Sequence, residues 1–140
     1  MTDSLLPHLQ HALASRLTLS GPRHEEAFRL FNGFTEGRPD LVLDIYGGTL
    51  VVHDYADEPN PSLVREVVEH VRVSLNWLHA VVVKTRNGKT QEEKRGKLIF
   101  GERPDRKIKE HGVWYAIDLT VNRDASFYLD TSLLRKWLTE

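Results

Sequence analysis

The chain has 140 residues, of which 40% are hydrophobic and 28% are charged, and its formal net charge is −1. This composition is typical of one folded domain with a hydrophobic core. The absence of cysteine excludes disulfides, thiolate zinc sites and a cysteine nucleophile. The sequence contains no apolar run of about 18 residues and no secretory signal pattern, so we expect a cytoplasmic protein without a membrane partner.

The first half of the sequence predicts a leading helix, an ambiguous segment and a hairpin. The helix is expected to begin at Ser4 and to end at Gly21-Pro22, and its apolar face carries leucines spaced four apart, namely Leu5, Leu9, Leu13 and Leu17. Residues 24–31 fit either a short helix or a strand. Residues 41–46 and 49–53 are typical of strands, and Gly47-Gly48 between them suits a two-residue hairpin turn.

The second half predicts a helix followed by strands. Asn60 and Pro61 are typical of a helix start, and an apolar stripe extends the helix to about Trp77. Residues 80–84 resemble a strand that is covered on both faces. A polar loop at 86–96, a strand at 97–101 and an alternating strand at 113–121 follow. The expected fold is a single α+β domain, with a mixed or antiparallel sheet that carries helix 61–78 on one face.

Few residues carry an obvious chemical signal. The chain has no glycine-rich nucleotide motif, and the pair with helical spacing among its scattered histidines, His8 and His11, is best interpreted as a surface pair. Asp44 and Asp118 each lie between apolar strand residues, where a solvated, outward-facing carboxylate is the commonest outcome. Asp130 is a candidate N-cap of a helix at 131–138.

Positive charge is concentrated between Lys84 and Lys109. This segment contains ten Lys or Arg residues and four acidic residues, a net +6, so the rest of the chain carries −7. The pattern is compatible with a solvated loop and also with a surface that faces phosphates.

Three blocks of sequence occur in an order that resembles a known family. Residues 28–47 (FRLFNGFTEGRPDLVLDIYG) resemble the pattern Y-R-L-x-N-G-E-x-D-G-L-P-G-L-V-V-D-R-Y-G. Residues 109–118 (KEHGVWYAID) resemble E-E-H-G-x-x-x-x-V-D, and residues 124–132 (DASFYLDTS) resemble K-T-G-x-F-L-D-Q-R. The chain is thus similar, over about residues 5–138, to bacterial SAM-dependent methyltransferases that modify cytosine C5 in large-subunit rRNA, and to their uncharacterised relatives.

The resemblance implies a division into a leading helix (1–22), a central α+β domain (23–124) and the start of a SAM-methyltransferase domain (125–140). S-adenosylmethionine (SAM) would then be the cofactor of the full-length protein, with Phe127, Tyr128 and Asp130 as the residues that carry over from the pocket motif. The family's preceding PUA domain and the Rossmann-like catalytic domain are not in this sequence. Thr131-Ser132 replaces the family's Q-R, and without cysteine the cytosine C5 mechanism is not possible.

The implied partner is RNA, most simply rRNA, and the 140-residue chain alone is expected to be inactive. The cations predicted to contact phosphates are Lys84, Arg86, Lys89, Lys94, Arg95 and Lys97. Trp114, Tyr115 and Tyr46 are candidates for stacking a flipped base, with sheet packing as the alternative. Two other hypotheses stay open: a stand-alone RNA- or protein-binding module, and a homodimer that pairs through Trp137-Leu138.

Overall fold

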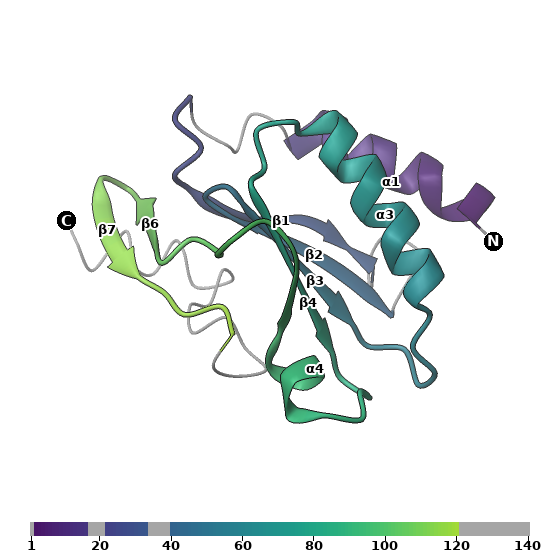
Figure 1. Ribbon diagram of the computed structural model, residues 1–140. Helices are drawn as coiled ribbons and strands as arrows, with labels where there is room; N and C mark the ends of the chain where they lie inside the picture. Colours follow the sequence, from purple (N-terminus) through teal and green to yellow (C-terminus); the bar gives the residue numbers. More distant parts are fainter. Residues whose placement is uncertain (1, 17–21, 34–39, 121–140) are drawn as a thin grey trace.

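The protein is built around a mixed five-stranded sheet. The computed structural model describes residues 2–16, 22–33 and 40–120. The strands lie side by side in chain order (Figure 1), as β1 (Ala27–Asn32), β2 (Leu41–Tyr46), β3 (Thr49–Asp54), β4 (Ala80–Thr85) and β5 (Lys97–Phe100). Only the β3–β4 pair of this sheet is parallel. A parallel pair needs a crossover, and helix α3 provides it. The predicted α+β class and the hairpin at Gly47-Gly48 are confirmed.

Two helices, α1 (Thr2–Arg16) and α3 (Pro61–Ser74), cover one face of the sheet (Figure 1). The predicted start of α3 is confirmed, because the Asn60 side chain accepts a hydrogen bond from the Leu63 backbone N–H at 3.2 Å. The helix ends at Ser74, about one turn before the predicted end. Helix α1 begins at Thr2, so Ser4 lies inside it and is not its cap. The main hydrophobic core lies between these helices and the sheet.

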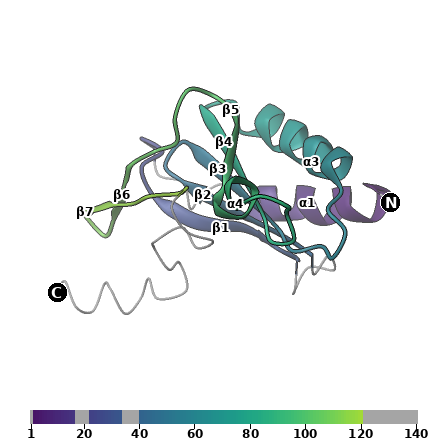
Figure 2. The ribbon, with the colours of Figure 1, turned by 60° about the horizontal axis from the view of Figure 1, so that its bottom comes forward.

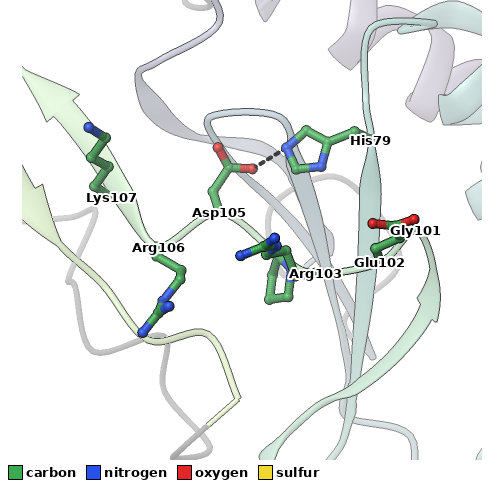
Figure 3. A pocket seen from close by; sticks show the side chains of 8 residues that line it. His79, Gly101, Glu102, Arg103, Asp105, Arg106 and Lys107 are labelled. Atoms are coloured by element: carbon green, nitrogen blue, oxygen red, sulfur yellow. Dashed lines mark ion pairs between the residues drawn. The ribbon is translucent and has the colours of Figure 1, made fainter.

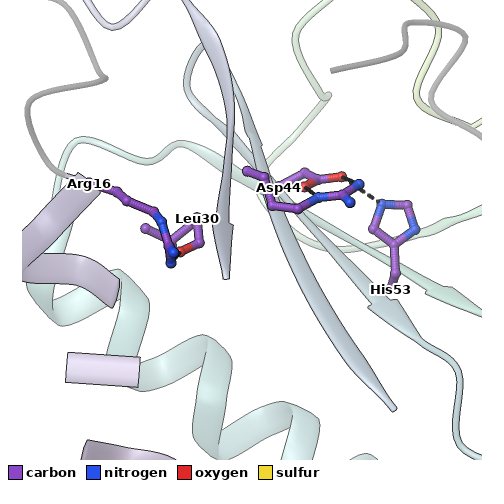
Figure 4. Close-up of polar contacts among 5 residues, drawn as sticks. Arg16, Leu30, Asp44 and His53 are labelled. Carbon is purple, nitrogen blue, oxygen red and sulfur yellow. Dashed lines mark hydrogen bonds and ion pairs between the residues drawn. The ribbon is translucent and has the colours of Figure 1, made fainter. Parts of the chain in front are cut away.

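A β-bulge explains why residues 24–31 were ambiguous in the sequence. The register between β1 and β2 shifts between Arg29 and Phe31, so Leu30 and Phe31 are both buried on the helix side although they are adjacent. The side chain of Arg16 donates to the Leu30 carbonyl at 2.8 Å, and Figure 4 shows Arg16 reaching that position from the end of α1. This bond fixes the leading helix to the irregular part of the sheet.

A second, smaller core covers the other face of the sheet. The antiparallel hairpin of β6 (Lys107–Glu110) and β7 (Val113–Ala116) lies on the far side of the sheet from both helices (Figure 2). The buried residues of this core are Tyr46, Val51, Val82, Ile108, Ile117 and Leu119. The predicted strand 113–121 is therefore too long: it ends at Ala116, and the next residues leave the strand to fill this core.

The structure changes one further expectation and confirms another. The polar loop 86–96 contains a short helix, α4 (Gln91–Arg95), whose cap Thr90 accepts a hydrogen bond from the Glu93 N–H at 3.1 Å. Strand β4 is covered on both faces as predicted, with Val81 in the main core and Val82 in the second. No helix of the described residues is long and apolar enough to cross a membrane.

Candidate functional site

A cavity of about 680 Å³ lies beside the β2–β3 hairpin. His79 and the loop that joins β5 to β6 line it, namely residues 101–107 with the sequence GERPDRK (Figure 3). We call it the 101–107 cavity. It combines residues that follow α3, residues that follow β5 and the first residue of β6, so it exists only in the folded chain.

Asp105 holds the cavity loop in place. Its Oδ1 accepts hydrogen bonds from the Thr49 hydroxyl at 2.6 Å and from the Gly48 N–H at 3.2 Å, and it lies 2.7 Å from Nε2 of His79. The Asp105 N–H donates in turn to the Thr49 hydroxyl at 2.8 Å. Figure 3 shows the pairing of the Asp105 carboxylate with His79. The carboxylate is thus committed by these hydrogen bonds to positioning the loop.

The glycines of the β2–β3 turn allow this close approach. A Cβ at Gly47 would collide with the Asp105 carboxylate, and a Cβ at Gly48 would collide with the His79 ring. Gly47 also has a φ of +62°, which disfavours other residues. The Gly47-Gly48 pair therefore serves two purposes, since it forms the predicted turn and also leaves room for one wall of the cavity.

The rest of the cavity wall is cationic. Arg103, Arg106 and Lys107 are exposed and line it, and Glu102 is the remaining acidic side chain in the lining. Because Asp105 is engaged by its hydrogen bonds, the lining favours an anion such as phosphate over a cation.

The predicted phosphate-binding cations do not form one cluster. Lys84 is only 3% exposed, so it does not lie on the surface with the others. The remaining five lie around α4, at the opposite end of β4 from His79: Arg86, Lys89, Lys94, Arg95 and Lys97. Sequence reasoning did not single out Arg103, Arg106 or Lys107, although all three lie in the segment with net charge +6.

A buried carboxylate, paired with a partly exposed arginine, lies on the same sheet face as the second core. The Arg29 guanidinium donates to Asp44 through Nε at 2.8 Å and through Nη2 at 3.3 Å. Nε2 of His53 lies 3.2 Å from the same carboxylate, and Figure 4 shows His53 beside Asp44. Asp44 is 1% exposed, so the expectation of a solvated carboxylate is wrong here. A carboxylate buried between two cross-strand partners has no signal in a single sequence.

The electrostatic balance keeps Asp44 ionised. Burial alone opposes its ionisation, but the hydrogen bonds from His53 and Arg29 outweigh burial and hold the Asp44 pKa below its ordinary value. The same contact raises the pKa of Arg29. With its oxygens occupied by two donors, Asp44 is suited to anchoring β1, β2 and β3 rather than to proton transfer.

The other candidate residues have different outcomes. Asp118 is exposed, as expected for a solvated carboxylate, although it lies two residues beyond the end of β7. His8 and His11 are exposed as well. The described residues contain no group of three His, Asp or Glu side chains that could hold a metal ion. Tyr46 is 2% exposed and cannot stack a base, which supports the packing alternative. The proposed cofactor residues Phe127, Tyr128 and Asp130 lie outside the described residues, as does the Trp137-Leu138 pair.

Comparisons with known proteins show the fold. No protein-family model and no curated protein matches the sequence. A candidate SAM-dependent methyltransferase from Streptococcus mutans matches with a TM-score of 0.76 and 18% identity, over 94% of this chain. SMU.776, a candidate methyltransferase whose crystal structure contains SAH, matches with a TM-score of 0.77 and 19% identity, also over 94%. The chain spans about a third of their length, 34% and 33% respectively.

Proposed function

We propose that this chain is the N-terminal, substrate-presenting portion of a SAM-dependent RNA methyltransferase, with rRNA as the favoured substrate. The observation that carries the proposal is the shared fold over 94% of the chain with two candidate methyltransferases, one of them solved with SAH. When bound to the full-length protein, SAM would supply the methyl group for a nucleobase. The residues described above would bind and orient the RNA.

The charges of the 101–107 cavity support an RNA partner. Arg103 and Arg106 offer planar guanidinium groups, which bind phosphate oxygens through two parallel hydrogen bonds, and Lys107 adds a compact charge. Such contacts neutralise the nucleic-acid backbone without reading its sequence. The Asp105 network holds all three cations on one anchored loop, which reduces the entropy lost on binding.

The methyltransferase part of the proposal is tested with the product of the complete reading frame. Isothermal titration with SAM is expected to show binding to that product, and radioactive methyl transfer to total RNA is expected to follow. The 140-residue chain, assayed in parallel, is expected to show neither. If the complete product does not bind SAM, or if the 140-residue chain alone methylates RNA, the proposal fails.

The RNA part is tested by the salt dependence of binding. Two matched variants each remove three positive charges: Arg103, Arg106 and Lys107 of the cavity, or Arg86, Lys89 and Arg95 near α4. Fluorescence anisotropy with a labelled single-stranded RNA measures affinity against salt concentration. Loss of three phosphate contacts should lower the slope of log affinity against log salt by about 2. We expect this decrease for the cavity variant, and an equal slope for both variants and the wild type would contradict the proposal.

One observation favours a second candidate, a stand-alone RNA- or protein-binding module. The three cations of the cavity wall and the residues that anchor them all belong to this chain, so anion binding needs no further domain. In this alternative a stop codon would directly follow Glu140 in the gene. A reading frame that continues into a glycine-rich loop after a strand would favour the methyltransferase instead.

A further inference from the structure

We infer that the β6–β7 hairpin is a stacking platform for an unpaired nucleobase, and that Trp114 is its contact surface. The inference rests on the proposed function and deepens it, because it names single-stranded RNA as the substrate class. It concerns a surface outside the 101–107 cavity, although Lys107 belongs to both.

The two faces of the hairpin are chemically different. Ile108 and Glu110 are buried on the inner face, which contributes Ile108 to the second core. Trp114 is on the outer face, directly opposite Lys109 in the strand register, and 45% of it is exposed. Lys107 shares this face, two positions before Lys109. The strand alternation thus places a large aromatic ring between lysines, on the side that faces solvent.

The two lysines indicate what kind of partner the ring takes. The ammonium nitrogens of Lys107 and Lys109 lie 4.6 Å and 5.7 Å from the centroid of the Trp114 ring. An apolar protein partner that covered the ring would have to desolvate both charges without compensation. A nucleotide offers a planar base for the indole and a phosphate for the ammonium groups, so charge and shape are both complementary.

The hairpin is attached to the body of the protein by a backbone hydrogen bond and by the second core. The Lys109 N–H donates to the Glu25 carbonyl at 2.8 Å, and Ile108 packs in the second core. The Ile117 N–H donates to the Arg106 carbonyl at 3.0 Å, which closes the base of the hairpin itself. Lys107 is at once the last lining residue of the cavity and the first residue of β6. Lys107 therefore connects the cationic lining of the cavity with the Trp114 indole, so one RNA strand can contact both.

Unpaired RNA suits this geometry better than a duplex. Inside a duplex, each base is stacked between its neighbours, and its faces are not available to an aromatic side chain. An unpaired strand can place a base on Trp114 while its phosphates reach the lysines and the cavity. Stacking of this kind tolerates every base, because each base has a π-face.

The test compares three labelled ligands of about 12 nucleotides by fluorescence anisotropy: oligouridylate, a blunt RNA duplex, and an abasic ribose-phosphate strand. Trp114→Ala should weaken oligouridylate binding about tenfold and leave the duplex and the abasic strand unchanged. Trp114→Phe should recover most of the affinity, because it keeps an aromatic face. Val113→Ala removes apolar surface from the same hairpin and should change nothing. Circular dichroism and a thermal melt establish that each variant is folded.

The outcomes separate this inference from the proposed function. An equal loss for all three ligands, or wild-type affinity for oligouridylate in Trp114→Ala, overturns the stacking platform and leaves RNA binding intact. Failure of the wild type to bind any ligand overturns both proposals. If Trp114→Ala instead converts a dimer into a monomer in light scattering, with RNA affinity unchanged, the indole is a contact between copies and the inference is wrong.

Discussion

Replacing Asp44 with asparagine tests the buried ion pair most directly. The variant keeps the shape of the side chain and one acceptor oxygen, but it removes the charge that receives the bonds from Arg29 and His53. Removing one partner of a buried pair commonly costs about 3–5 kcal/mol. The Arg29 side chain is 44% exposed and is hydrated again when its partner is removed, so solvent screening reduces the free-energy cost of losing the ion pair. We expect a loss of about 2 kcal/mol, which for a chain of this size lowers the melting temperature by about 8 °C.

The stabilisation by Asp44 should depend on pH. Because the Asp44 pKa is lower in the folded state, its ionisation stabilises the protein above the unfolded value of about 3.9. That contribution disappears as the pH falls through the lower folded-state pKa, so the wild type and Asp44→Asn should converge in strong acid. Urea unfolding at several pH values measures both effects. The control is Asp118→Asn, at an exposed aspartate just beyond the end of β7, which should change stability by less than about 0.5 kcal/mol. Equal effects of the two substitutions at pH 7 would refute the reasoning.

Four further substitutions, at three positions, test other parts of the fold by thermal melting. Burial raises the pKa of Asp54, and Asp54→Asn removes this titration while it still accepts from the Ala56 N–H. As the pH falls through the raised pKa towards about 3.9, the stability of the wild type should increase relative to that of Asp54→Asn. A difference in melting temperature that does not change with pH would contradict this. Asn60→Ala removes the cap of α3 and should cost about 1 kcal/mol, whereas Asn60→Asp should be nearly neutral. Gly101→Ala should cost more than about 2 kcal/mol, since φ is +87° and the new Cβ would strike the His79 carbonyl; an unchanged melt would show that this loop adapts.

The elements predicted correctly from sequence are those with local signals. Gly47-Gly48 lies between two runs of β-forming residues, and Asn60-Pro61 precedes a stripe of branched apolar residues. Each signal lies within or next to the element that it specifies, so these elements depend little on contacts with distant parts of the chain. The structure confirms the hairpin and the start of α3 for this reason.

The features that the sequence left open or predicted wrongly depend on contacts between distant parts of the chain. The bulge in β1 places Leu30 and Phe31 on one face, a pattern that matches neither a regular strand nor a helix. Asp44 appears in sequence as an outward-facing strand residue, and it does face away from the helices. That face is buried, however, and the partner Arg29 comes from another strand.

The candidate site shows the same division between local and long-range information. The cationic character of residues 84–109 is visible in the sequence, but its distribution in space is not. Hydrogen bonds between Thr49 and Asp105, which are 56 positions apart, hold the loop 101–107. The turn at Gly47-Gly48 leaves room for this contact. These contacts place Arg103, Arg106 and Lys107 beside one another and hold Lys107 next to Trp114. The segment around α4 carries similar charge, yet β4 separates it from this surface. A polyanion that follows the cavity and the hairpin would therefore leave the α4 cations in solvent, and the two triple-charge variants measure whether it does.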